Sequence, residues 1–178
     1  MKVIAVAGAA LLATSCGKQS NQNTQIVPAS DVTREFIGTC VKTLADPAKI
    51  TSLMKISKSV IVTDPDVLRL AAPEAPSPDM QMWLHKIAGH SVFVTTNSGL
   101  LKGRTIRVCT LAFKGGNIDD VVNDMASVTK AKKIDDSVEN GQRYRMYELN
   151  EGDHHVMINV TDGTPIGTMT GSVSAMVL

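Results

Sequence analysis

Residues 143–160 read RYRMYELNEGDHHVMINV, and residues 166–177 read IGTMTGSVSAMV. Apolar and polar residues alternate along both stretches, which is the period of a half-buried β-strand. Turn-forming residues interrupt the alternation at residues 151–153 (EGD) and 162–163 (DG). We therefore predict an antiparallel meander of three strands, at residues 143–149, 154–160 and 166–177.

The last of these strands has one apolar and one polar face. The apolar face carries Met169, Val173, Ala175 and Val177, and the polar face carries Thr168, Thr170, Ser172 and Ser174. We interpret this strand as an edge of the sheet. An exposed edge can bind another chain through its backbone, although plain hydration of the polar face accounts for the same pattern.

Two more strands are expected upstream, at residues 91–95 and 103–113, joined by a turn at residues 97–99. Both faces of the second strand carry apolar residues, so it is either a central strand covered on both sides or a strand with a bulge. Residues 80–87 fit a helical turn slightly better than a strand, because Trp83, Leu84 and Ile87 share a helical face. The charged segment 130–139 is expected to be solvated.

Helices are predicted mainly in the N-terminal half. Asp31 is a plausible helix start, and the apolar residues after it, which include Cys40, follow helical spacing. Asp-Pro pairs at residues 46–47 and 64–65 are typical helix starts. A fourth helix is expected after Asn117. The predicted fold class is therefore α+β, with N-terminal helices packed on one face of an antiparallel sheet of about five strands.

The first sixteen residues combine Lys2, an apolar run from Val3 to Ala13, and the sequence Ala13-Thr14-Ser15-Cys16. The run has eleven residues, whereas a membrane-spanning helix needs about 20. The segment resembles the signal of bacterial lipoprotein precursors, although Ala13 stands where such signals usually have Leu. The resemblance implies export, cleavage before Cys16 and lipidation of Cys16. Ordinary cleavage near Ser15 is the alternative, which would leave a soluble periplasmic or secreted protein.

The resemblance also implies a location. In such lipoproteins, Asp after the cysteine signals retention in the inner membrane, and this chain has Gly17. We therefore expect the periplasmic face of the outer membrane. The domain prediction is a signal peptide at 1–15, a polar tether at 16–30 and a single globular domain at 31–178.

Charge and composition argue against nucleic acid as a partner. The chain has 18 Lys and Arg against 17 Asp and Glu, and cleavage of the signal removes Lys2, so the mature domain is formally neutral. Binding to a phosphate backbone needs clustered positive charge. Aromatic residues make up 3% of the chain, which leaves few surfaces for stacking bases or sugars.

Besides Cys16, the chain contains Cys40 and Cys109. In an oxidising compartment such a pair normally forms a disulfide, and we predict this bond. A redox or metal role is the alternative, but the Cys-x-x-Cys spacing of redox sites is absent from the sequence. A helix carrying Phe36 and Cys40, followed by Trp83 and a strand with Cys109, is similar to small exported bacterial proteins of uncharacterised function. This similarity implies a scaffold and no chemistry.

Met80, Met82, Trp83 and His85 form a candidate metal site. In composition they resemble the ligands of small periplasmic copper(I) carriers, in which soft sulfur ligands select the ion. His155 and Met157, two apart on one strand face, are possible further ligands. The competing interpretation is that these methionines fill the core.

No motif in the sequence indicates catalysis: there is no Gly-x-Ser-x-Gly, no phosphate-binding loop and no His-Glu-x-x-His. We therefore expect a non-catalytic domain of the cell envelope, a structural or protein-interaction module. A periplasmic copper(I)-binding protein is the first alternative. An envelope hydrolase whose site is assembled from distant residues is the second.

Overall fold

The computed structural model describes residues 26–71, 78–163 and 169–178. The predicted signal peptide, Cys16 and the predicted tether up to residue 25 lie outside these ranges. Within them, no helix has the length and apolar character needed to cross a bilayer. Val27 is fully buried, so the packed part of the chain begins before residue 31.

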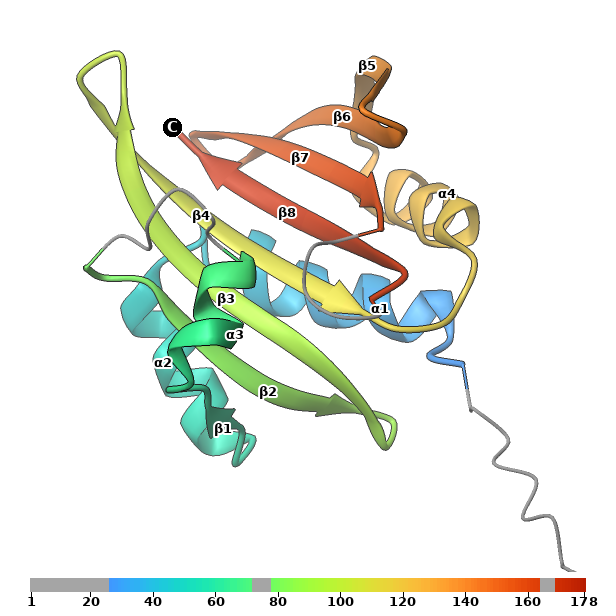
Figure 1. Ribbon diagram of the computed structural model, residues 1–178. Helices are drawn as coiled ribbons and strands as arrows, with labels where there is room; N and C mark the ends of the chain where they lie inside the picture. The colour runs from blue at the N-terminus through green and yellow to red at the C-terminus, as the bar shows by residue number, and fades with distance from the viewer. Residues whose placement is uncertain (1–25, 72–77, 164–168) are drawn as a thin grey trace, which may run out of the picture.

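The described ranges form one eight-stranded antiparallel sheet with helices on both faces (Figure 1). The helices are α1 (Ala29–Phe36), the π-helical segment η1 (Ile37–Val41), α2 (Pro47–Ile56), α3 (Pro65–Ala71) and α4 (Ile118–Thr129). The strands are β1 (Val60–Ile61), β2 (Gln81–Ile87), β3 (His90–Leu101), β4 (Arg104–Phe113), β5 (Lys132–Glu139), β6 (Gln142–Glu151), β7 (His154–Asp162) and β8 (Gly171–Val177).

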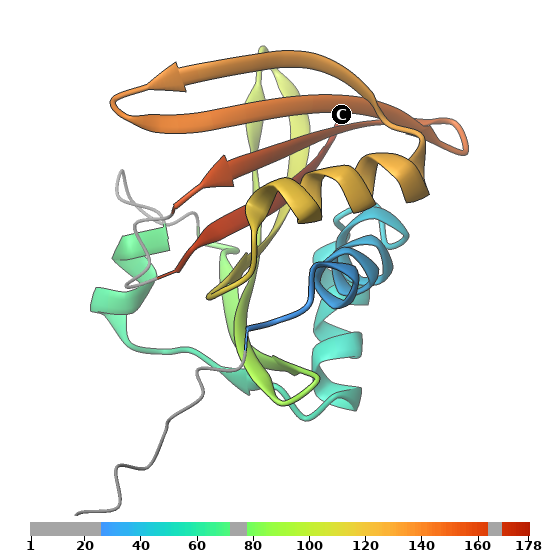
Figure 2. The ribbon, with the colours of Figure 1, turned by 90° about the vertical axis from the view of Figure 1, so that its right-hand side faces the viewer.

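The strand order is β1-β2-β3-β4-β8-β7-β6-β5, with every neighbouring pair antiparallel. The sheet thus consists of two meanders, β1–β4 and β5–β8, joined where β8 pairs with β4. Helix α4 makes the connection between them, and Figure 2 shows α4 and α1 together under the second meander.

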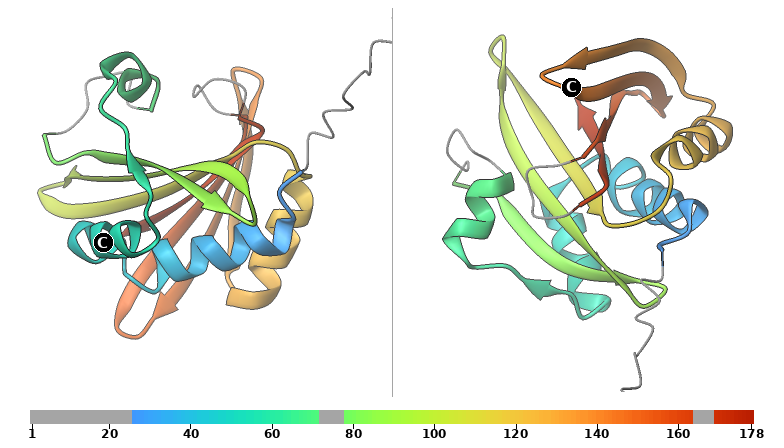
Figure 3. Two further views of the ribbon diagram at one scale, coloured as in Figure 1. Left: turned by 90° about the horizontal axis from the view of Figure 1, so that it is seen from below. Right: turned by 45° about the vertical axis from the view of Figure 1, so that its right-hand side comes forward.

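The main core lies between the sheet and the layer of α1, η1, α2 and α4. Its large buried side chains include Phe36, Ile50, Leu111, Met125 and Ile158. Helix α3 packs on the opposite face, where Val67, Leu68 and Ala71 cover Met82 and Ala112 (Figure 3). Strand β4 is therefore a central strand, the first of the two alternatives that its sequence left open, and on the α3 face it is buried at Ala112 while Val108 and Thr110 stay partly exposed.

The predicted fold class, N-terminal helices on one face of a sheet of about five strands, is wrong. The sheet dominates the molecule and has eight strands within the described residues, and α3 lies on the other face. Three strands were missed. Strand β1 has two residues, β2 was assigned to a helical turn, and β5 was taken for solvated chain.

The physical reason differs between the missed strands. In β2, Met82 and Trp83 are both buried, on opposite faces, because α3 covers one face and the main helix layer covers the other. This double burial hides the period of two. In β5, nearly every residue is exposed, so there is no apolar period to detect.

The last strand was also misplaced. Val173, Ala175 and Val177 are buried and Ser172 and Ser174 are half-exposed, as their alternation indicates. However, β8 lies in the middle of the sheet between β4 and β7 rather than at an edge. The edges are β1 and β5.

Candidate functional site

The residues of the candidate copper site do not come together. Along β2, successive side chains point to opposite faces, so Met82 lies under α3 while Trp83 and His85 face the main helix layer. His155 and Met157 lie on β7, and three strands separate β7 from β2. In the described part of the chain, no group of three or more His, Cys, Asp and Glu side chains is arranged to hold a metal ion.

His85 instead belongs to a hydrogen-bonded network with Glu35 and Ser59. Its Nε2 atom lies 3.2 Å from Oε1 of Glu35 on α1, and its Nδ1 atom lies 2.8 Å from Oγ of Ser59. The imidazole is buried, with 8% of its side chain exposed. These contacts fit a tautomer in which Nε2–H donates to the carboxylate and Nδ1 accepts the serine proton.

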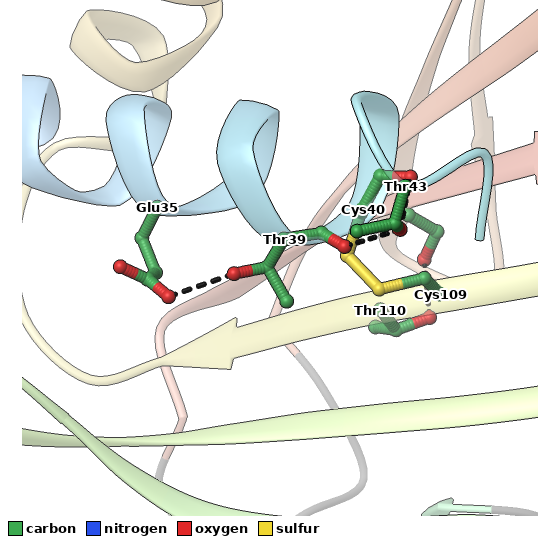
Figure 4. The surroundings of a disulfide bond; sticks show 7 residues. Glu35, Thr39, Cys40, Thr43, Cys109 and Thr110 are labelled. Carbon is green, nitrogen blue, oxygen red and sulfur yellow. Dashed lines mark hydrogen bonds between the residues drawn. A yellow bond between two sulfur atoms is a disulfide. The ribbon is translucent and has the colours of Figure 1, made fainter. Parts of the chain in front are cut away.

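Glu35 accepts a second hydrogen bond, 2.8 Å long, from the hydroxyl of Thr39 (Figure 4). The hydrogen bond from His85 lowers the pKa of the Glu35 carboxyl, and the bond from Thr39 and the electrostatic interactions with His85 and Arg34 act in the same direction. Partial burial opposes them. The carboxylate is thus held in its charged form.

The sequence of contacts from serine to imidazole to carboxylate is the order found in nucleophilic hydrolases. Chemically, it permits proton transfer from Ser59 to His85. Structurally, it ties β2 to α1 and to the turn between α2 and β1. Sequence reasoning missed this network, because residues 35, 59 and 85 carry no joint motif and meet only through the fold.

Cys40 and Cys109 form the predicted disulfide, with their Cα atoms 5.3 Å apart (Figure 4). The bond joins η1 to the centre of β4, and both cysteines are fully buried. It therefore fixes the helix layer to the sheet.

A second buried polar group lies at the other end of the helix layer. The guanidinium of Arg145 on β6 is 3% exposed and lies 2.8 Å from Oδ1 of Asp119 on α4. It also donates a 3.2 Å hydrogen bond to Asp162 on β7. These pairs hold the start of α4 against the second meander.

Three adjoining hollows lie beside α4, and we call them together the α4 groove. The first, of about 370 Å³, lies between α1, η1 and α4. The second, of about 190 Å³, shares Ile37 and Val128 with the first, and the third, of about 470 Å³, shares Thr129, Leu149 and Asn150 with the second. The shared residues place the three hollows next to one another, from α1 past the end of α4 to β6 and β7.

The chemistry of the α4 groove changes along its length. The first hollow has a mostly apolar lining that includes Ile37, Gly38 and Val128. The third is lined by Lys130, Lys132 and His155, with Glu148 as its acidic residue. His155, a candidate metal ligand from the sequence, thus lies at the basic end of the groove.

The π-helical segment η1 forms one wall of the groove. The amide of Lys42 donates to the carbonyl of Ile37, five residues back, at 2.9 Å. Ile37, Gly38 and Val41 from this segment line the first two hollows. Single π-turns within helices occur frequently at functional sites, but this one has no signature in the sequence.

Comparison of the chain with protein-family models, with curated proteins and with solved structures gave no match.

Proposed function

We propose that this protein is a non-catalytic binding domain of the bacterial cell envelope, exported and anchored through lipid on Cys16 at the periplasmic face of the outer membrane. The α4 groove is its binding surface. The single observation that carries the proposal is that the three hollows share lining residues, which places concave surface for an extended ligand or a partner segment side by side next to α4.

The sequence suggested a sheet edge as the binding surface, and we assign binding to the α4 groove instead. Edge strand β1 has two residues, which offers little backbone for pairing. Edge strand β5 has a register shift between Lys133 and Asp135 and is charged along its length. Bulges and charges at an edge are the features that prevent other strands from pairing with it.

Site-specific photo-crosslinking tests this function. A photoreactive amino acid is introduced in place of Val128, which lies in the groove and is 61% exposed, and the protein is irradiated in its own cells. Val138 on β5 is 67% exposed and lies outside the hollows described above, so the same replacement there is the matched control. We expect adducts at position 128 that are absent or several times weaker at position 138.

Mass spectrometry of the purified protein identifies the adducts and gives the intact mass. We expect this mass to correspond to a chain that begins at lipid-modified Cys16. Equal adducts at both positions, or none at either, would contradict the groove as the binding surface, and an unprocessed chain would contradict export.

A further inference from the structure

We propose that the ligand of the α4 groove is a single-chain anionic lipid, a long-chain fatty acid, whose chain lies in the first two hollows and whose carboxylate lies at the basic end. This inference rests on the proposed function, because it assigns a ligand class to the same groove. It is argued from the lining, the size and the charge of the three hollows.

The first hollow suits a hydrocarbon chain. Val128 remains 61% exposed at its side, and Ile37 is half-buried beside it. Gly38 lines the same hollow, and a Cβ atom added there would have no neighbour within 4 Å, so the glycine leaves open space. Exposed apolar side chains around open space are hydrated at a cost, which a bound acyl chain removes.

The second hollow adjoins the first and has a mixed lining, with apolar residues on the side shared with the first hollow and polar ones besides. Ile37 and Val128 extend into it, and Val41 and Leu149 join them. Lys42 and Glu151 also line it, and their side chains form an ion pair 2.7 Å long, so neither charge is unpaired there. With volumes of about 370 and 190 Å³, these two hollows together suit one acyl chain rather than the two of a phospholipid.

The third hollow supplies the positive charge. Lys132 is paired with Glu148 at 3.6 Å. Lys130, at the end of α4, has no ion-pair partner among the residues that the structure describes. A carboxylate in this hollow meets the free ammonium group of Lys130 and the imidazole of His155, so charge complementarity orients the ligand along the groove.

The energetic roles of the two ends differ. Each methylene that is buried strengthens binding by about fourfold, so the chain supplies most of the affinity. The pairing of a carboxylate with exposed lysines contributes less and mainly fixes the direction of binding.

The test is displacement of a fluorescent fatty acid from the purified mature protein by myristate, with myristyl alcohol as the uncharged analogue. We expect myristate to displace the probe at a concentration at least five times lower than the alcohol. Equal potency would overturn the anionic part of the proposal, and failure of the probe and of both competitors to bind would overturn the ligand class.

Matched variants locate the ligand. Val128→Glu places a charge where the acyl chain of the ligand is proposed to lie. We expect it to weaken myristate binding at least tenfold, whereas Val138→Glu leaves binding unchanged. Lys130→Glu should weaken binding about fivefold, whereas Lys102→Glu should not. Lys102 is the matched control because it is exposed, as Lys130 is, and both have a left-handed backbone, with φ of 50° at Lys102 and 58° at Lys130.

Thermal unfolding of each variant checks that it is folded. If Val128→Glu binds myristate as tightly as wild type does, the proposed position of the acyl chain is wrong. If Lys130→Glu does so, the proposed position of the carboxylate is wrong. If position 128 gives crosslinks to a protein and myristate does not bind, the fatty acid is the wrong ligand and the groove remains the binding surface. If neither occurs, both proposals are wrong.

Discussion

At the scale of single residues, the hydrogen bonds of Glu35 predict that the free energy of unfolding depends on pH. The pKa of Glu35 is lowered in the folded protein, chiefly by the hydrogen bond from His85. Its contribution to stability is therefore present above the pKa of the unfolded chain, about 4.3, and is lost as pH falls through the lower pKa of the folded state. We expect Glu35→Gln to lower the free energy of unfolding by about 1 kcal/mol at pH 6, because charged acceptors form stronger hydrogen bonds.

Urea denaturation at several pH values measures this difference between wild type and Glu35→Gln. The difference should shrink as pH falls below about 4, where the wild-type carboxyl also becomes neutral. A difference that stays constant from pH 7 to pH 3 would show that the charge of Glu35 contributes nothing.

Two specific links join α1 and η1 to the sheet, the Cys40–Cys109 disulfide and the hydrogen bond between Glu35 and His85. The sequence predicted only the disulfide. Two cysteines besides Cys16, in a chain predicted to be exported, leave one intramolecular pairing, so Cys40 and Cys109 could be matched without a fold. The Glu35–His85–Ser59 network could not be predicted, since its members lie on α1, on β2 and in the turn before β1 and no sequence spacing relates them. Arg145 was missed for the same reason.

At the scale of secondary-structure elements, the contact between β8 and α4 predicts a costly substitution. A Cβ atom added to Gly171 would lie 2.5 Å from Cδ1 of Ile118 and 3.1 Å from the carbonyl oxygen of Thr161. The isoleucine tip can rotate away, but the backbone of β7 cannot. We expect Gly171→Ala to destabilise the protein by about 1–3 kcal/mol, as overpacking does.

Gly99 on β3 is the matched control, because a Cβ atom there would meet its nearest neighbour, Cγ1 of Ile106, at an ordinary 3.9 Å. Gly99→Ala should change the free energy of unfolding by no more than about 0.5 kcal/mol. Chemical denaturation of both variants tests the comparison, and equal effects would mean that the contact of Gly171 with α4 is not tight.

Local signals indicated the starts of the helices but missed three strands, of which β2 and β5 are the longer two. Asp46 begins α2 as expected, and its carboxylate accepts hydrogen bonds from the amides of Ala48 and Lys49. Such caps are formed by neighbours in sequence, so they are readable from it. Strands β2 and β5 were missed because their burial is set by partners elsewhere: α3 covers one face of β2, and β6 pairs with β5 while leaving its side chains in water.

At the scale of the whole molecule, the disulfide joins the two layers and should be a large part of the stability. It closes a loop of 69 residues, for which the chain-entropy model gives about 4 kcal/mol. We expect the double variant Cys40→Ala/Cys109→Ala to unfold at a temperature lower by roughly 10 °C. Calorimetry measures this change.

Wild-type protein that has been reduced and alkylated under denaturing conditions and then refolded is the companion experiment. It should lose at least as much stability as the double variant, since alkylation adds bulk to two fully buried side chains. Unfolding temperatures that match the oxidised wild type would show that the cross-link does not stabilise the fold.

The order of the strands could not be predicted from the sequence. Hairpins between successive strands follow from short turns, and the sequence indicated the one near residues 151–153. The turn expected at residues 97–99 was wrong, because these residues pair within β3 and the chain turns at Lys102 and Gly103 instead. The pairing of β4 with β8 joins residues 107–113 to 171–177 and depends on which edge each meander leaves open. This non-local choice decided whether β8 lay at the edge or at the centre.

The central position of β8 also governs how the molecule is assembled. Until residues 171–177 insert, β4 and β7 each have one unpaired side, and neither meander can complete the core that it shares with α4. Pairing between such distant segments is intrinsically slow. Before it is complete, the unpaired edges of β4 and β7 can pair with strands of other molecules of the same protein. Refolding yield should therefore fall as protein concentration rises, because insertion within one molecule competes with aggregation between molecules.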